Sequence, residues 1–169
     1  MKATRILLVA IAAIMTATMT ACGIYSFTGA SYGTAKTVSI DYFQNRSTYV
    51  NSTLSSKITE DLKDRFMSQT PLTLVKDGGD LHFEGTITGY TITTAAIKAG
   101  ETAASNRLTI TLKVTFSNQT APENDFDKSY SRYADYDVSS SFAAVESTLV
   151  DEIVELLIDD IFNDSVVNW

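Results

Sequence analysis

The chain has 169 residues, with 13 Lys and Arg, 20 Asp and Glu, one His and one Cys, and a formal net charge of −7. An acidic chain without a basic cluster argues against nucleic acid as the main partner. One Cys cannot form an internal disulfide, and one Cys with one His is too few for a zinc site, so we expect no metal and no cofactor. A hydrophobic content of 44% is typical of a folded domain with a sizeable core.

The charge is distributed unevenly along the chain. Lys2 and Arg5 lie in an N-terminal stretch that contains no acid. Residues 22–132 contain 11 basic and 11 acidic residues, whereas residues 133–169 contain nine acids and no base. The chain after residue 21 therefore has a charge of −9, and all of that excess lies in residues 133–169.

Residues 1–21 are predicted to be a bacterial signal peptide. Lys2 and Arg5 form a short positive region in front of the apolar run ILLVAIAAIM at residues 6–15. A run of this length is typical of a signal peptide and is too short to span a bilayer as a helix.

Cys22 is the predicted lipid anchor. The preceding residues Met19, Thr20 and Ala21 complete a pattern that resembles the lipobox of bacterial lipoproteins, in which the Cys becomes residue one and carries three acyl chains. Residues 22–36 are then a lipidated flexible tether, and Gly23 after the Cys favours the outer membrane. The alternative is a secretory signal cleaved nearby that leaves Cys22 as a free thiol.

Residues 37–80 are predicted to form a strand, a helix and a second strand. The first strand alternates apolar and polar residues, with three apolar positions at Val38, Ile40 and Tyr42. Apolar residues then recur at every fourth position and predict a helix: Val50, Leu54, Ile58, Leu62 and Phe66. Ser47 and Thr48 are its candidate N-caps, and Pro71 ends it. Residues 72–75 form a short strand that would run parallel to the first, before a turn at residues 77–80.

The remaining residues predict three longer strands and a final helix. Alternation over residues 81–92 changes phase at Gly89, which indicates a bulge or bend. After a loop at residues 95–105 come the clearest strand, at 108–117, and a Tyr-rich strand at 126–138. A helix from Ser141 to Asn163 would bury one side, made up of Val145, Leu149, Ile153, Leu156 and Leu157.

The predicted fold class is therefore α+β, with the order β-α-β-β-β-β-α in a single domain over residues 37–169. Two helices packed on one face of a mixed four- to five-stranded sheet bury both apolar helix sides in the simplest way.

The patterns that would support catalysis are incomplete. Ser31 lies in a G-x-S-x-G match at residues 29–33, but this match is in the tether and precedes a strand instead of a helix. The only His, His82, lies two residues from Glu84, and we interpret it as a solvated side chain instead of a proton-transfer partner. The acids at 125–127 and in the final helix are interpreted as solvated too. We predict that the protein is not an enzyme.

Lys98 and Arg107 are the candidate ligand-binding residues. They flank the loop between two long strands, where basic side chains are suited to phosphate groups. The alternative for each is a solvated surface charge. The tyrosines of residues 126–138 either contact a sugar or acyl chain or fit a half-buried sheet.

Three segments carry a family resemblance: CGIYSFTG at residues 22–29, TVSIDYFQNRS at 37–47 and DLHFEGTITGY at 80–90. Together with the amphipathic helix, the strand at Leu108 and the final helix, they resemble the LptE family, most closely its Bacteroidetes-type members. The resemblance covers essentially all of residues 22–169. It implies a fold of two helices on a mixed four-stranded sheet.

The resemblance also implies a function. LptE proteins are anchored in the inner leaflet of the outer membrane, plug the β-barrel LptD, assist its assembly and promote lipopolysaccharide delivery to the surface. We therefore expect a lipid-anchored protein on the periplasmic face of the outer membrane, with an LptD-type barrel and lipopolysaccharide as partners. The alternatives are an accessory periplasmic binding lipoprotein of another secretion or envelope complex, and a hydrolase that uses Ser31.

The uneven charge leads to one further expectation. Lipid A phosphates are anionic, so the acidic residues 133–169 should point away from them or reach them through divalent cations. Direct contact with lipopolysaccharide is expected on the charge-balanced part before Tyr133.

Overall fold

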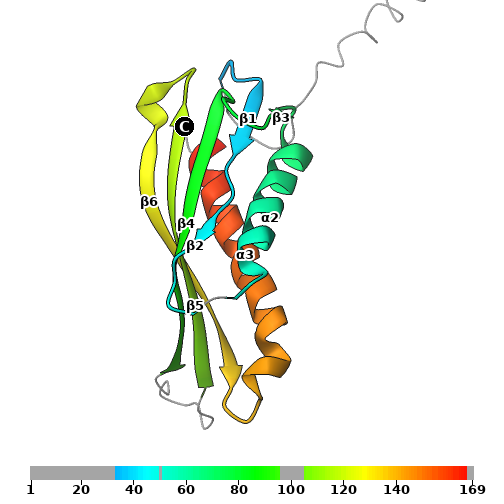
Figure 1. The fold of residues 1–169 in the computed structure, drawn as a ribbon, viewed down its shortest axis with the longest axis vertical. Helices are drawn as coiled ribbons and strands as arrows, with labels where there is room; N and C mark the ends of the chain where they lie inside the picture. Colours follow the sequence, from blue (N-terminus) through cyan, green and yellow to red (C-terminus); the bar gives the residue numbers. More distant parts are fainter. Residues whose placement is uncertain (1–32, 50, 96–104, 167–169) are drawn as a thin grey trace, which may run out of the picture.

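A computed structural model describes residues 33–49, 51–95 and 105–166 of the chain. The predicted signal peptide, Cys22 and Lys98 lie outside these residues. The described chain forms a mixed six-stranded sheet, and two helices cover one of its faces (Figure 1). This arrangement confirms the predicted α+β architecture.

The sheet combines a parallel and an antiparallel part. Its main strands are β1 (Thr37–Ile40), β3 (Thr73–Leu74), β4 (Leu81–Ala95), β5 (Ser105–Asn118) and β6 (Phe126–Asp137). They lie in the order β3-β1-β4-β5-β6. As predicted, β1 is parallel to β3; it is also parallel to β4, while β4, β5 and β6 pair antiparallel.

One short strand was not expected from the sequence. β2 (Gln44–Asn45) pairs in parallel with β4, because Gln44 lies beside Thr86 and Asn45 beside Ile87. Two residues are too few to show a periodic pattern, so sequence periodicity cannot detect such a strand.

The two helices are α2 (Leu54–Gln69) and α3 (Phe142–Val166), and a short 3₁₀ helix η2 (Pro122–Asn124) connects β5 to β6. Thr70 ends α2 by donating its N–H to the carbonyl of Phe66, and Pro71 follows, as expected. Among the described helices, none is both long enough and apolar enough to cross a membrane.

The predicted irregularity at Gly89 is a β-bulge. The register between β4 and β5 shifts between Ile87 and Gly89. Ile87 pairs with Leu112 before the shift, and Tyr90 pairs with Ile110 after it. All four side chains are buried, so the bulge keeps the apolar side chains of β4 on the helix-covered face despite the change of phase.

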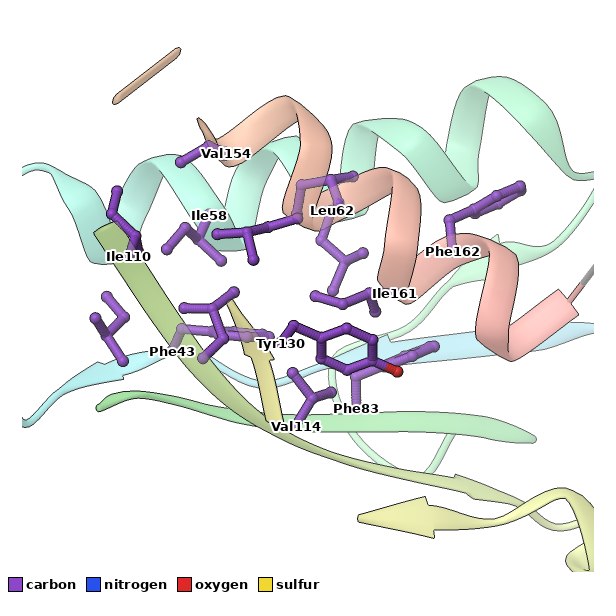
Figure 2. Packing of buried hydrophobic residues seen from close by; sticks show 14 of the residues in the cluster. Phe43, Ile58, Leu62, Phe83, Ile110, Val114, Tyr130, Val154, Ile161 and Phe162 are labelled. Atoms are coloured by element: carbon purple, nitrogen blue, oxygen red, sulfur yellow. The ribbon is translucent and has the colours of Figure 1, made fainter. Parts of the chain in front are cut away.

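The core lies between the sheet and the helices and contains a chain of aromatic contacts. The ring of Phe66 on α2 lies 5.0 Å from Phe83 on β4 and 5.1 Å from Phe162 on α3. Phe83 in turn lies 4.7 Å from Phe116 on β5. Figure 2 shows Phe83 and Phe162 together with apolar side chains of both helices. These contacts join both helices to the central strands in one core.

The predicted start of α2 is wrong. Ser47 and Thr48 precede the helix by several residues, and the N–H of Ser47 instead donates to Asn45 Oδ1 in a local turn. The helix begins at Leu54, where Asn51 Oδ1 accepts the N–H groups of Thr53 and Leu54 at 3.0 and 3.1 Å. A short polar side chain that bonds its local backbone favours a turn over continuation of the helix.

Two predicted inward side chains point outward. Tyr42 is 53% exposed because β1 ends at Ile40, and Phe43 fills the core in its place. Leu156 is 40% exposed, while its neighbour Leu157 is fully buried. The apolar residues that α3 buries are Leu149, Val150, Ile153, Val154, Leu157, Ile158, Ile161, Phe162 and Val166.

Candidate functional site

Arg107 is the one predicted ligand-binding residue that falls within the described residues. Its Nε and Nη2 donate to the two carboxylate oxygens of Asp135 at 2.7 and 2.9 Å. The guanidinium carbon also lies 3.5 Å from the ring centroid of Tyr133. The hydrogen bond to Asp135 raises the pKa of Arg107 above its ordinary value. Arg107 is therefore a fixed positive charge, held by a carboxylate and an aromatic ring.

This Arg–Tyr–Asp arrangement lies on the face of the sheet that the helices leave uncovered, which we call the open sheet face (Figure 1). Its side chains alternate with the buried ones along β4, β5 and β6. Many of them are hydroxyl residues: Thr86, Thr91, Thr93, Thr109, Thr111, Thr115, Ser117, Ser129 and Ser131. The hydroxyls of Thr111 and Ser131 lie 3.1 Å apart across the strands. The open sheet face is thus a broad surface of hydrogen-bond donors and acceptors.

A polar hollow of about 450 Å³ lies beside this face. Charged residues of both signs line it: Arg46 and Lys113 are positive, and Asp41 and Glu84 are negative. Lys113 is paired with Asp127 on β6 at 3.1 Å. The remaining lining residues are Tyr42, Gln44, Gly85, Thr86 and Thr115.

His82 lies at the margin of this region and is more constrained than the sequence suggested. Its Nδ1 is 2.8 Å from Ser39 Oγ, and its Nε2 is 3.4 Å from Glu84 Oε1 and 3.9 Å from Asp41 Oδ2. The side chain of His82 is only 25% exposed, and both of its ring nitrogens have polar neighbours. His82 is therefore not free in solvent.

Ser39, His82 and Glu84 resemble a catalytic triad in residue type only. Ser39 is fully buried, and its Oγ accepts the N–H of Gly79 at 3.1 Å. A nucleophile must reach the substrate, and a hydroxyl enclosed between β1 and β4 does not. Ser31, the nucleophile considered from the sequence, lies outside the described residues.

Several acids of the final helix α3 form ion pairs with basic residues of other elements. Arg132 and Lys128 on β6 pair with Asp160 and Asp164 at 2.6 and 2.9 Å. Two basic residues of α2 do the same, because Lys57 pairs with Asp151 at 2.9 Å and Arg65 pairs with Asp159. Basic residues from earlier elements therefore partly neutralise α3, and the interpretation of these acids as simply solvated is wrong for the paired ones.

Two tyrosines also bond the acids of α3. Tyr90 donates its hydroxyl to Glu146 at 2.7 Å, and Tyr130 donates to Asp164 at 3.0 Å. Burial raises the pKa of both phenols, and the neighbouring carboxylates raise it further. The two hydroxyls stay protonated and join β4 and β6 to the two ends of α3.

A comparison with models of protein families matches residues 35–165 to LptE, described as lipopolysaccharide-assembly. The chain belongs to the LptE family. The match extends over every described strand and all of α3 except Val166. LptE is a family without enzymatic activity, in line with the prediction from the sequence.

Solved structures share the fold of this LptE protein at low sequence identity. The hypothetical protein CT253 from Chlamydia trachomatis has 9% identity and a TM-score of 0.51, with 78% of this chain and 98% of that chain covered. A Helicobacter pylori homolog of neuraminyllactose-binding hemagglutinin has 7% identity and a TM-score of 0.51, with 78% and 83% covered. These similarities show the fold alone. A comparison with curated protein sequences found no match.

Proposed function

We propose that this protein is an outer-membrane lipoprotein, anchored through Cys22, that plugs an LptD-type β-barrel, assists its assembly and binds lipopolysaccharide. The observation that carries the proposal is the LptE match over residues 35–165. The predicted signal peptide at residues 1–21 and the lipobox-like residues before Cys22 support export and lipid anchoring on the periplasmic face.

The open sheet face supports a position inside a barrel. The interior of a large outer-membrane barrel is polar, and a plug must offer it hydrogen-bonding groups. The open sheet face carries hydroxyls on three adjacent strands, for example Thr91, Thr109 and Ser131. The opposite face of the sheet is occupied by α2 and α3. We therefore assign barrel contact to the open sheet face.

Arg107 and Lys98 are the proposed contacts to lipopolysaccharide phosphates. Arg107 lies near the start of β5, where its charge is fixed by Asp135 and Tyr133. A phosphate would have to share or replace the carboxylate of Asp135, because that carboxylate occupies two donors of the guanidinium.

The proposal is tested by affinity purification of the anchor-intact protein from membranes after photo-crosslinking. A photoreactive residue at Thr109 should capture a large barrel protein, whereas one at the exposed Glu155 on α3 should capture much less. Recovery without any large barrel protein contradicts the proposal. Recovery of a different envelope complex, with lipopolysaccharide export intact after depletion, supports an accessory lipoprotein instead.

The anchor has its own test. Replacement of Cys22 by Ala should abolish labelling of the protein with radioactive palmitate and release it from membranes. Labelling that persists in the Cys22→Ala protein contradicts the assignment of Cys22.

A further inference from the structure

Three side chains of metal-ligand type lie together beside the polar hollow, and the proposed function uses none of them. Asp41, His82 and Glu84 each offer one ligand atom, and these atoms all lie within 4.8 Å of one another. We propose that Asp41, His82 and Glu84 bind a divalent transition-metal ion, with Zn²⁺ as the reference ion. The site would lie at the margin of the open sheet face.

Two of the three distances between the ligand atoms are close to those around a small ion, and all three are at most 4.8 Å. Zn²⁺ binds imidazole nitrogen and carboxylate oxygen at about 2.0–2.2 Å, which separates two tetrahedral ligands by about 3.4 Å. Nε2 of His82 lies 3.4 Å from Oε1 of Glu84 and 3.9 Å from Oδ2 of Asp41. The second distance needs a change of about 0.5 Å to reach that spacing. The side chain of Asp41 is 49% exposed and has room to move by that amount.

Ser39 orients the imidazole from the interior. Its Oγ lies 2.8 Å from His82 Nδ1, so the other ring nitrogen, Nε2, is directed at the two carboxylates. With a metal on Nε2, the ring proton resides on Nδ1 and is donated to Ser39 Oγ. That oxygen has two lone pairs and also accepts the N–H of Gly79. A metal-binding His usually has such a partner on its second nitrogen.

The local charges also favour a cation. Asp41 and Glu84 reach the same imidazole, and two carboxylates at this separation repel each other. Two basic residues border the same hollow, Arg46 and Lys113, and Lys113 is already paired with Asp127. A divalent ion would neutralise both carboxylates. The imidazole selects Zn²⁺ over Ca²⁺ or Mg²⁺, which take oxygen ligands.

A bound ion would join segments that are far apart in the sequence. Asp41 lies in the connection between β1 and β2, whereas His82 and Glu84 lie on β4. The N–H of Asp41 already donates to the carbonyl of Phe83 at 2.9 Å, so the ion would reinforce an existing contact. The hollow leaves a fourth position open to water or to an anionic ligand. Because the ion binds the folded chain, it should raise the melting temperature.

The test is a Zn²⁺ titration of the detergent-solubilised protein without a His tag, followed by calorimetry and by thermal unfolding. We expect one Zn²⁺ per chain and a melting temperature that rises with Zn²⁺ concentration. His82→Gln and Glu84→Gln should abolish both effects. Ser39→Ala should weaken binding about 10- to 100-fold, because it removes the hydrogen-bond partner of the ring and leaves the three metal ligands in place. Co²⁺ bound at the same site should give an absorption band that His82→Gln loses.

Three controls make the result decisive. Glu152→Gln changes an exposed carboxylate on α3, on the far side of the sheet, and should leave Zn²⁺ binding unchanged. Cys22→Ser should leave it unchanged too. Ca²⁺ in excess should not displace Zn²⁺. Absence of saturable binding, binding retained in His82→Gln, binding lost in Cys22→Ser, or displacement by Ca²⁺ each overturns the proposal. Circular dichroism of His82→Gln and Glu84→Gln should match that of the unaltered protein, which checks that both variants remain folded.

Discussion

Gly85 is a residue whose identity is imposed by a neighbouring ring. A Cβ atom added at Gly85 would lie 2.0 Å from Cε1 of Phe43, and Phe43 is fully buried. Overpacking of a core typically costs about 1–3 kcal/mol. We predict that Gly85→Ala lowers the free energy of unfolding by this amount, measured by chemical denaturation.

The reason for that loss can be tested with a second substitution. In a Phe43→Leu background the ring is absent, so the same Gly85→Ala change should cost clearly less. Equal costs in the two backgrounds would contradict the contact between Gly85 and Phe43 as the cause.

Asp80 ties the start of the domain to β4. Its Oδ2 accepts the N–H groups of Lys36 and Thr37 at 2.8 and 3.0 Å, and the hydroxyl of Thr37 at 2.9 Å. These hydrogen bonds, with that from Lys36 as the largest contribution, lower the pKa of Asp80 below its ordinary value of 3.8. The ionised carboxylate is therefore the form that the fold favours.

This leads to a prediction about acid stability. Since the folded pKa lies below the unfolded one, the contribution of Asp80 is present above about pH 4 and is lost as the pH falls through the folded pKa. The difference in unfolding free energy between the wild type and Asp80→Asn should be constant near neutral pH and shrink below pH 3.8. Denaturation at a series of pH values measures it. A difference that does not change with pH would contradict this role.

At the scale of elements, the edge strand β6 is held to α3 by polar contacts. Lys128, Tyr130 and Arg132 alternate along β6 and reach Asp164 and Asp160. Tyr130 is the most enclosed of the three, at 8% exposed. Charges and a covering helix on an edge strand also disfavour pairing with another chain.

Tyr130→Phe tests this attachment. It removes one hydrogen bond to a carboxylate that keeps Lys128 as a partner, so we predict a loss of about 1 kcal/mol in unfolding free energy. Tyr49→Phe, at a tyrosine that is 48% exposed, is the matched control and should have little effect. Equal losses in the two variants would indicate that the bond to Asp164 contributes nothing specific.

The strands show which elements periodicity can predict. The alternation around Leu108 and the phase change at Gly89 both correspond to observed features, because burial on one side of a sheet imposes a period of two. The predicted start of α2 is several residues too early, because Ser47 forms a local turn and Asn51 provides the cap. Capping residues in a polar stretch compete for the same role, and only the folded chain decides between them.

The candidate metal site shows where sequence reasoning stops. Counting only Cys and His excluded a zinc site, although carboxylates are also zinc ligands. The sequence places His82 and Glu84 two residues apart on one strand, which brings them to the same face. Asp41 joins them only through the parallel pairing of β1 with β4, in which Ile40 lies beside Phe83. Long-range strand register is not contained in local periodicity.

At the scale of the whole molecule, much of the excess negative charge lies on α3, where basic residues of other elements pair with part of it. Ion pairs with α2 and β6 engage Asp151, Asp159, Asp160 and Asp164. The basic partners of α3 are thereby surrounded by carboxylates, and α3 itself carries no basic residue. The excess of negative charge that remains on α3 disfavours lipid A phosphates there.

This charge arrangement predicts where lipopolysaccharide makes contact, provided that the protein binds it as proposed. Two exposed positions differ in local charge: Thr91 on the open sheet face and Glu152 on α3. A photoreactive residue is placed at each of them. We expect crosslinks to lipopolysaccharide to form mainly from position 91, because anionic phosphates avoid the carboxylates of α3. Magnesium should raise the yield at position 152 if cations mediate contact there. Crosslinks that form mainly from position 152 in the presence of a chelator would place the ligand on the helix layer instead.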